Sequence, residues 1–309
     1  MISLSENDLL SKQADPLIGS ELINMENNIK QYDIRMVALD LDGTTLNSER
    51  RISERTKRAF AGCREKGVHV VVSTGRVFTA LPDDVKNVDA IEYAVTSNGA
   101  HINEIATGRS IYDDYLSEAA VKEVARLYRE LDAEIEVFFD GRAFIAEDYY
   151  NQIKEHGLEY RSAEYVLWSR KPVKDILDLL LSNSDRIENV NFCFKSLDEL
   201  ERNKAAVMAI PESTVTSSFI NNLEVGGPDT SKKKALARLL GMLGLRREQL
   251  MCCGDAPNDI EMIEYAGLGV AVGNAWGGTK EHADYITGTN DEDGVAQAIE
   301  KFVLADRQL

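Results

Sequence analysis

The sequence predicts an α/β protein with a Rossmann-like, doubly wound parallel-sheet core and an inserted α+β cap domain. Three observations carry this prediction. Short apolar runs at residues 36–39, 68–72 and 250–253 are typical of buried parallel strands. Each run leads into a polar cluster that contains glycine. Between residues 104 and 220 the pattern changes to hairpin signals mixed with helices, which is typical of an α+β unit.

The first elements place two carboxylates at the end of a strand. Residues 1–34 are polar with weak apolar spacing, and we expect an N-terminal arm there. The first strand, over residues 36–39, ends in DLDGT at residues 40–44. Two aspartates one residue apart repel each other, so a cation or the protonation of one must offset the repulsion. The pair favours a site in which one Asp attacks and the other donates a proton. The alternative is an acidic turn that only closes the strand.

Two further strands are expected to end in polar loops. Ser53 is a suitable cap for a helix that ends near Gly67. The second strand then runs into STGR at residues 73–76, and a strand over residues 92–96 runs into SNG at residues 97–99. Because sites form at the carboxyl ends of strands in open parallel sheets, these loops are expected to converge on one edge.

The middle of the chain predicts the cap, over residues 104–220. The dipeptides Thr107-Gly108 and Asp140-Gly141 indicate hairpins. Helices are expected from Ser117, from Pro172 and over residues 197–208. Strands are expected over residues 134–139, 142–146, 187–194 and 213–219. The aromatic-rich segment that contains Phe138, Phe139, Phe144, Tyr149 and Tyr150 is better explained by packing than by a substrate cage.

The last part of the chain is expected to return to the core at residues 222–225. A helix with Ser231 and three lysines at its start follows, and the strand over residues 250–253 ends in GDAPND at residues 254–259. Residues 267–272 and 283–286 indicate two more strands, and residues 294–303 a closing helix. The core is therefore expected to comprise residues 35–103 and 221–309.

The polar clusters, in this order, resemble the motifs of the haloacid dehalogenase superfamily of phosphoryl-transfer enzymes. These motifs are D-x-D-G-T, a hydroxyl residue, a lysine and G-D-x-x-x-D. The matching positions are Asp40, Asp42, Thr74, Lys232, Asp255 and Asp259. SNGA at residues 97–100, GNA at residues 273–275 and Asn290 before residues 291–295 are similar to the Cof-type branch, which carries a large α/β cap. The resemblance extends from about residue 36 to residue 303.

The resemblance implies a role for each matched residue. Asp40 would be the nucleophile that forms an aspartyl-phosphate, and Asp42 the acid and base. Mg²⁺, a hard cation that prefers oxygen ligands, would be held by the side chains of Asp40 and Asp255 and the backbone carbonyl of Asp42. Asn258 and Asp259 would then orient these ligands.

Other residues are expected to contact the phosphate or the leaving group. Thr74 and the N–H of Gly43 would bind the phosphoryl group. Gly75, Arg76 and Asn98 stand at loop ends within reach of the substrate, although Arg76 is equally well explained by a structural ion pair.

The lysines at 232–234 oppose the helix macrodipole, which favours anions at a helix start. An anionic group facing Lys232 would explain this, and the resemblance pairs Lys232 with Asp40 and the phosphate. Lys233 and Lys234 are expected to be solvated. The family often has Gly where Lys233 stands, and many relatives have an apolar residue at Thr45, where we expect a packing change.

The second aspartate, Asp42, also reduces the number of reaction classes that the resemblance allows. Within the superfamily, an acid at the position of Asp42 implies a phosphatase or phosphomutase rather than a dehalogenase or transport ATPase. The leading hypothesis is a Mg²⁺-dependent phosphatase for small phosphorylated metabolites, with sugar phosphates favoured. The alternatives are a phosphohexomutase, a phosphatase for a flavin or pyridoxal cofactor, and a non-catalytic phospholigand-binding regulatory protein.

The composition disfavours several other classes of protein, namely those that bind nucleic acid, enter membranes or are secreted. The 309 residues include 52 acidic and 35 basic side chains, a net charge of -17, which discourages binding to nucleic acid or anionic membranes. The chain has no apolar stretch near the ~20 residues of a membrane span and no signal-peptide pattern, so a cytoplasmic location is expected. The sequence leaves monomer and homo-oligomer equally open.

Cysteine and histidine give no sign of a metal or redox site. The four cysteines, at positions 63, 193, 252 and 253, include no C-x-x-C pair, and buried packing explains them better than zinc or redox chemistry. The four histidines are scattered singly.

Overall fold

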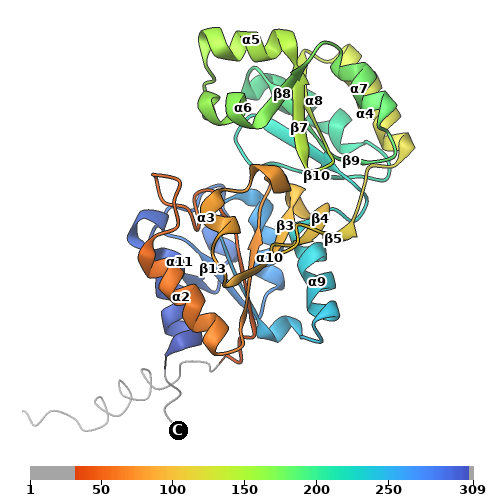
Figure 1. Cartoon of the computed structure of the whole chain (residues 1–309). Helices are drawn as coiled ribbons and strands as arrows, with labels where there is room; N and C mark the ends of the chain where they lie inside the picture. The colour runs from red at the N-terminus through yellow and green to blue at the C-terminus, as the bar shows by residue number, and fades with distance from the viewer. Residues whose placement is uncertain (1–31, 306–309) are drawn as a thin grey trace, which may run out of the picture. The chain divides into compact units, whose positions relative to one another are not determined.

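The structure is a computed structural model and describes residues 32–305. The arm expected over residues 1–34 lies outside the described residues, apart from its last three positions. Within the described part, the strands form two separate sheets, each with its own covering helices (Figure 1). The first is the core sheet and the second is the cap sheet.

The core sheet has the doubly wound order that the sequence predicts. Its strands lie in the spatial order β14 (Tyr285–Ile286), β13 (Leu268–Ala271), β12 (Leu250–Gly254), β1 (Met36–Leu39), β2 (His69–Ser73), β3 (Ile91–Thr96), β4 (His101–Glu104) and β5 (Ser110–Asp113). The strands from β14 to β3 are parallel, and β4 and β5 are antiparallel. The chain winds outward from β1 to β3 and later returns beside β1 at β12. Ligands bind where the winding direction reverses, which here is between β1 and β12.

Alternating side chains explain why the core strands are apolar throughout. Val37 and Leu39 of β1 pack with helix α2 (Glu54–Glu65) and helix α11 (Gly294–Ile299) on one face. Met36 and Ala38 pack on the other face, against α9 (Lys232–Met242) and α10 (Ile260–Tyr265). Figure 1 shows α2 and α9 on opposite sides of this sheet. Both faces are buried, so the strands lack a polar alternation.

The cap sheet is mostly antiparallel, and its largest apolar cluster covers one face. Its strands lie in the order β10 (Thr214–Thr216), β11 (Asn222–Gly226), β9 (Ile187–Phe194), β6 (Ala133–Phe139), β7 (Arg142–Ala146) and β8 (Arg170–Val173). Only the pair of β7 and β8 is parallel. Three helices supply the apolar cover, α4 (Glu118–Glu130), α7 (Ile176–Ser182) and α8 (Leu197–Met208). Helices α5 (Glu147–His156) and α6 (Ala163–Ser169) pack near β7 and β8.

Short helical segments fill many of the connections. They are η1 (Phe78–Ala80), α3 (Asp83–Lys86), η2 (Ser97–Gly99), η3 (Arg247–Gln249), η4 (Pro257–Asp259), η5 (Thr279–His282), η6 (Asn290–Glu292) and η7 (Glu300–Leu304). Two of them, η2 and η4, follow β3 and β12 directly and carry residues of the site described below.

Three expectations from the sequence are corrected. Residues 222–225 do not return to the core, because β11 pairs with β9 and β10 of the cap sheet. The hairpin around Gly108 extends the core sheet past residue 103, since β4 pairs with β3. Pro172 does not begin a helix. It lies in β8 at the edge of the cap sheet, where a missing N–H is tolerated.

The helix starts expected at Ser53 and Ser117 are confirmed. Each of these hydroxyls accepts a hydrogen bond from a backbone N–H in the first helical turn, which satisfies a donor that the helix itself leaves unpaired. Helix α7 begins at Ile176, where Asp175 supplies the same cap.

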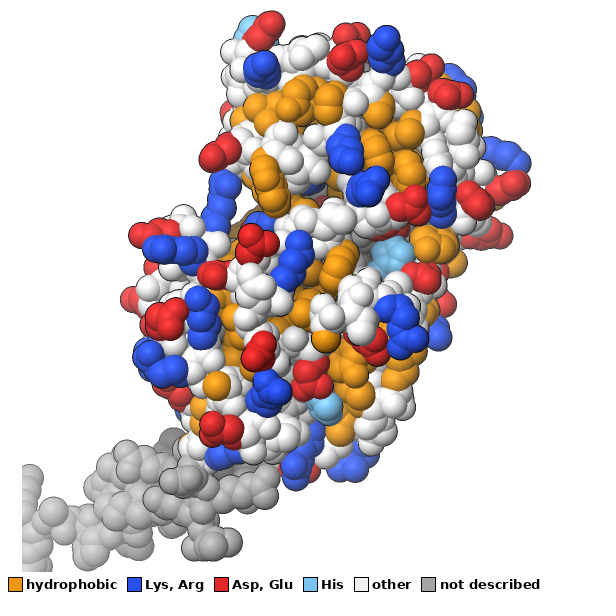
Figure 2. Space-filling view, in the orientation of Figure 1, with side chains coloured by type: hydrophobic (Ala, Val, Ile, Leu, Met, Phe, Trp, Pro, Cys, Tyr) orange, Lys and Arg blue, Asp and Glu red, His pale blue; other side chains and the backbone are white. Residues whose placement is uncertain are grey.

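Surface charge and helix composition are relevant to whether the protein binds nucleic acid or a membrane. Acidic and basic side chains are interspersed over the face drawn in Figure 2. Among the described residues, no helix combines the length and the apolar character needed to cross a bilayer.

A histidine contacts carboxylates from both sheets, and its protonation should make the stability of the fold depend on pH. His101 Nδ1 on β4 lies 2.5 Å from Asp113 Oδ1 on β5, and its Nε2 lies 3.3 Å from Glu188 Oε1 on β9. Burial alone would lower the pKa of His101, but the two carboxylates outweigh it and raise this pKa above its ordinary value. The folded protein therefore binds the proton more tightly than the unfolded chain does.

We predict that this contribution to stability is complete below the unfolded pKa of about 6.5. It should be lost as the pH rises through the raised folded pKa. Urea unfolding of the wild type between about pH 6 and 9 should show stability falling in this window, and the fall should be smaller in His101→Gln. Equal pH slopes in the two proteins would contradict the prediction.

Candidate active site

Three carboxylates and one ammonium group meet at the ends of β1 and β12. Lys232 Nζ donates to Asp40 Oδ1 at 2.6 Å and to Asp259 Oδ1 at 2.7 Å. Carboxylate oxygens of Asp40, Asp255 and Asp259 all lie within 4.8 Å of one another. Asp40 follows β1, Asp255 follows β12, and Lys232 begins α9, so segments almost 200 residues apart in the chain converge as expected.

Burial makes this cluster electrostatically strained. Lys232 is 2% exposed, and three negative charges against one positive charge leave an excess of two. Burial raises the pKa of Asp40 well above its ordinary value, with Asp259 and Asp255 adding to the effect and Lys232 opposing it. Burial, followed by Asp259, raises the pKa of Asp255 to about 7. The carboxylates of Asp259 and Asp40 outweigh burial and raise the pKa of Lys232.

Asp259 supports the cluster rather than facing the cavity. Its Oδ2 accepts hydrogen bonds from the backbone N–H groups of Asp255 and Ala256, at 3.0 and 3.1 Å. Its Oδ1 accepts from Lys232. Both oxygens are therefore engaged, and this carboxylate fixes the loop after β12 and the position of the lysine.

The loop after β1 is held close to Asp255. Gly43 has a φ of 81°, and a Cβ there would lie 2.6 Å from Asp255 Oδ2, so only glycine fits. Thr44 Oγ1 donates to Asp255 Oδ1 at 3.0 Å, and Thr45 Oγ1 donates to the carbonyl of Asp40 at 2.5 Å. Thr45 thus does more than change the packing of the loop.

Two asparagines from the Cof-like motifs brace the same loop. Asn274 Nδ2 donates to the carbonyl of Gly43 at 2.7 Å, and Asn290 Nδ2 donates to the carbonyl of Leu46 at 2.9 Å. The backbone N–H of Asn290 in turn donates to Asn274 Oδ1 at 2.9 Å. These contacts give both motif residues a physical function, which is to hold the loop that carries Asp40 and Asp42.

Arg76 forms the ion pair that the sequence left as an alternative. Its Nε and Nη2 donate to the two carboxylate oxygens of Asp42, at 2.7 and 2.6 Å, and its Nη1 donates to the carbonyl of Ala80 at 3.0 Å. The ring of Tyr165, from the cap, lies 4.7 Å from the guanidinium carbon. Thr74 Oγ1 accepts from the backbone N–H of Arg76 at 3.2 Å.

Asn98 links the core to the cap. It adopts a left-handed conformation with a φ of 55°, and a Cβ on Gly75 would contact its side chain. Its Nδ2 donates to Glu224 on β11, and its Oδ1 accepts from Asn258 Nδ2 at 3.1 Å. The side-chain amides of Asn98 and Asn258 therefore each have a protein partner, and Asn258 also lines the cavity that contains Asp40 and Asp255.

A cavity of about 320 Å³ lies between the core and the cap. From the core it is lined by Asp40, Asp42, Thr74, Gly75, Arg76 and Asp255. From the cap it is lined by Phe138, Arg161, Tyr165, Arg170, Asn191 and Glu224. The cap residues could not be selected from the sequence. Strands such as Ile135-Glu136-Val137 alternate between apolar and polar side chains, but an antiparallel sheet with one covered face shows the same alternation without any functional site.

The acidic cluster fits a divalent cation. Asp40 and Asp255 are buried oxygen donors, and their surplus negative charge is compensated only in part by Lys232. Hard cations such as Mg²⁺ take carboxylate oxygens, and such an ion would offset both the burial and the mutual repulsion that raise the pKa values of Asp40 and Asp255. The donor set therefore matches the expected Mg²⁺ site.

Comparison with known proteins agrees with this geometry. The family of haloacid dehalogenase-like hydrolases matches residues 37–299. A protein of Bacillus subtilis, the 5-amino-6-(5-phospho-D-ribitylamino)uracil phosphatase YcsE, is 34% identical, covering 89% of this chain and 98% of its own. A second B. subtilis protein with the same activity in its name, YwtE, is 27% identical and covers 87% and 98%.

A solved structure shows the same fold. A haloacid dehalogenase-like hydrolase from Bacteroides thetaiotaomicron superposes with a TM-score of 0.72 at 25% identity, covering 87% of this chain and 99% of that one. The chain therefore belongs to the haloacid dehalogenase-like hydrolases, which confirms both the resemblance, including its Cof-type branch, and the expectation of an enzyme.

Removing the positive charge of Lys232 tests how much this residue stabilises the folded protein. Lys232→Met leaves Asp40 and Asp259 without their shared cation, and breaking a buried ion pair in this way costs about 3–5 kcal/mol. We predict a loss of this size in the free energy of unfolding, measured by urea denaturation with a chelator present. Lys233→Met, one residue along, should change it by less than about 0.5 kcal/mol. Similar losses in both variants would show that Lys232 has no special electrostatic role.

Proposed function

We propose that this protein is a Mg²⁺-dependent phosphatase that hydrolyses small phosphorylated metabolites through an aspartyl-phosphate on Asp40. The observation that carries the proposal is that Asp40 and Asp255 lie close together on the wall of a cavity between the core and the cap, with Lys232 bound to Asp40. Phosphoryl transfer depends mainly on positioning and charge neutralisation, and this wall offers both.

Asp40 is the nucleophile in the proposed reaction. Lys232 holds Oδ1 and so fixes the rotation of the carboxylate. A carboxylate oxygen of Asp40 attacks phosphorus, and the bond between phosphorus and the ester oxygen breaks. Thr74 lines the cavity beside it and can donate to a phosphoryl oxygen, as can the N–H of Gly43. Mg²⁺, held by Asp40, Asp255 and the Asp42 carbonyl, would neutralise the charge that develops on the phosphoryl oxygens.

Asp42 transfers the proton in both halves of the reaction. It protonates the leaving ester oxygen, and it then takes a proton from the water that attacks the aspartyl-phosphate. Arg76 engages both of its oxygens, so proton transfer requires this pair to separate in part. Arg76 therefore positions Asp42 and is close enough to contact the substrate.

The relatives suggest the kind of substrate. Two of them are named for a uracil that carries a phosphorylated ribitylamino chain, which is a sugar-alcohol phosphate. This favours a sugar or sugar-alcohol phosphate over pyridoxal phosphate for this chain. The assays below distinguish a phosphatase from a phosphohexomutase.

Asp40→Asn should abolish phosphate release while leaving the fold intact, because the amide is a poor nucleophile. Release would be measured from a generic aryl phosphate and from a panel of sugar phosphates, with circular dichroism as the fold control. Asp185→Asn, an exposed change in the cap, should retain turnover. Turnover by Asp40→Asn would exclude Asp40 as the nucleophile. An isomer in place of free phosphate would indicate a mutase, and wild type that is inactive on the whole panel would contradict the proposed substrate class.

Thermal unfolding provides a test of the metal site that is independent of activity. MgCl₂ at about 100 times its dissociation constant should stabilise the wild type by about 2.7 kcal/mol. Asp255→Asn should lose most of this effect, since one buried carboxylate ligand is removed, whereas Asp185→Asn should keep it. If Mg²⁺ shifts the melting temperature of Asp255→Asn as it does the wild type, Asp255 is not a ligand.

A further inference from the structure

The cap sheet has a polar face that is buried. Glu136 on β6 is the register partner of Asn191 on β9, and Asn191 is the partner of Glu224 on β11. These three side chains form a row across adjacent strands, which we call the polar row. Their exposed fractions are 0%, 2% and 7%. Their neighbours Ile135, Val137 and Phe192 point to the opposite, apolar face.

Burying polar groups is costly unless they are paired, so such a row indicates a structural network or a ligand site. Two of its residues, Asn191 and Glu224, line the same cavity as Asp40. The row therefore forms part of the cap wall opposite the acidic cluster.

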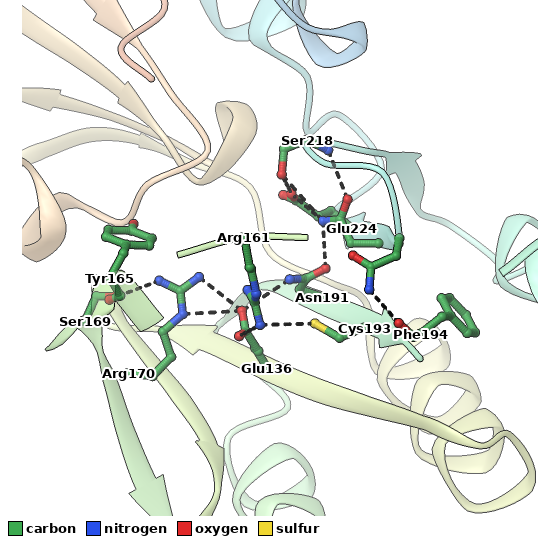
Figure 3. Close-up of polar contacts among 12 residues, drawn as sticks. Glu136, Arg161, Tyr165, Ser169, Arg170, Asn191, Cys193, Phe194, Ser218 and Glu224 are labelled. Atoms are coloured by element: carbon green, nitrogen blue, oxygen red, sulfur yellow. Dashed lines mark hydrogen bonds and ion pairs between the residues drawn. The ribbon is translucent and has the colours of Figure 1, made fainter. Parts of the chain in front are cut away.

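The acceptors of Glu136 are fully used by the protein. Arg161 Nη2 donates to its Oε1 at 2.5 Å, and Arg170 Nη2 and Nε donate to its Oε2 at 3.0 and 3.3 Å (Figure 3). Asn191 Nδ2 adds a further bond to Oε2 at 3.2 Å. Arg161 and Arg170 outweigh burial and lower the pKa of Glu136 to about 2, so this carboxylate is ionised.

The acceptors of Asn191 and Glu224 are also used. Asn191 Oδ1 accepts from Asn222 Nδ2 at 2.9 Å. Glu224 accepts from Ser218, from Asn222 and, through its other oxygen, from Asn98. Burial raises the pKa of Glu224, although the bonds from Ser218 and Asn222 oppose the rise. Both carboxylate oxygens of Glu224 are therefore engaged by protein donors.

The groups of the two cap arginines that remain available are donors, and Arg161 has more of them than Arg170. Its guanidinium carries five N–H donors, and a single nitrogen, Nη2, makes the bonds to Glu136 and to Cys193 Sγ. Arg170 is more fully engaged, since Nε and Nη2 bind Glu136 and Nη1 donates to Ser169 Oγ at 2.9 Å. Arg161 and Arg170 both bind the single carboxylate of Glu136, which holds the two guanidinium groups side by side.

Aromatic rings flank the available donors. The guanidinium carbon of Arg161 lies 4.9 Å from the ring centroid of Phe219, and that of Arg170 lies 5.3 Å from Phe138 and 5.1 Å from Tyr165. All three rings line the cavity. Flat apolar surfaces beside a guanidinium edge suit a planar group that carries oxygen acceptors.

We propose that the cap wall is a specificity site in which Arg161 binds a planar oxygen-acceptor group on the leaving part of the substrate, either a ring carbonyl or a carboxylate. Glu136 and Arg170 position Arg161, and Asn191 supplies a second donor. This inference rests on the proposed phosphatase function and names the class of leaving group that the site selects.

Matched pairs of phosphate esters test the proposal. Uridine 5′-monophosphate adds a ring with two carbonyls to ribose 5-phosphate, and 3-phosphoglycerate adds a carboxylate to the frame of glycerol 3-phosphate. The wild type should show a kcat/KM that is higher by about tenfold or more for the acceptor-bearing member of at least one pair, as expected for a hydrogen bond to a charged donor. The pair that shows the preference identifies the ring carbonyl or the carboxylate as the ligand group.

Variants of Arg161 decide whether this residue causes the preference. Arg161→Gln should remove most of the preference within the pair, and Arg161→Lys should do so too because the ammonium lacks the planar fork. Arg202→Gln removes one exposed cap charge on α8 and should retain the full preference. If Arg161→Gln fails to fold, Arg161→Lys decides. Absence of any preference in the wild type, or full preference in the Arg161 variants, would overturn the proposal.

A binding measurement separates this proposal from the proposed function. Calorimetry on Asp40→Asn compares the affinity for the two members of each pair without turnover. Tighter binding of the acceptor-bearing member, lost when Arg161→Gln is added, supports the specificity site even if the wild type releases no phosphate. Equal affinities in Asp40→Asn overturn the specificity site, whereas phosphate release by the wild type would still support the phosphatase.

Discussion

The buried charge imbalance at the ends of β1 and β12 is the constraint on which the site depends. Three carboxylates share one ammonium group in a region with little solvent, and Lys232 can neutralise only one of the negative charges. Such an arrangement is unfavourable for stability, because desolvation penalises each ionised group. A divalent cation would offset the excess of two negative charges, and the cavity beside the cluster leaves room for it.

Much of the surrounding structure serves to hold these groups together. Gly43 allows the loop after β1 to approach Asp255, and Asn274 and Asn290 hold that loop through its carbonyl groups. Asn98 and Glu224 extend the network into the cap. Asn98 also accepts a hydrogen bond from Asn258, in the loop that follows β12. The side chain of Asn98 therefore connects this loop to the cap sheet.

The sequence predicted the core well because parallel strands have a strong signal. Continuous apolar runs followed by polar loops can be recognised one by one, and their convergence follows from the doubly wound order. The structure brings Asp40, Lys232 and Asp255 together at this edge, as that convergence implies. Residues 222–225 were misassigned because a short strand with two apolar residues fits a core or a cap sheet equally well, and only its pairing with β9 distinguishes them.

The cap wall could not be predicted in the same way. Arg161 lies on a connection between α5 and α6, and Glu136 and Asn191 become neighbours only through the register of β6 and β9. Pairing between strands 55 residues apart is decided by long-range packing that leaves little local trace in the sequence. The ion pair of Arg76 with Asp42 was also undecided, since both partners also suit a direct contact with substrate.

The most direct test of the account is to trap the covalent intermediate. Wild-type protein turning over a phosphate ester with Mg²⁺ would be quenched in acid and its peptides mapped by mass spectrometry. The account predicts one added phosphoryl group on the peptide that contains Asp40, localised to that side chain. Phosphate release with the phosphoryl group on another residue, or with water attacking the substrate directly and no phosphorylated peptide under rapid quenching, would contradict it.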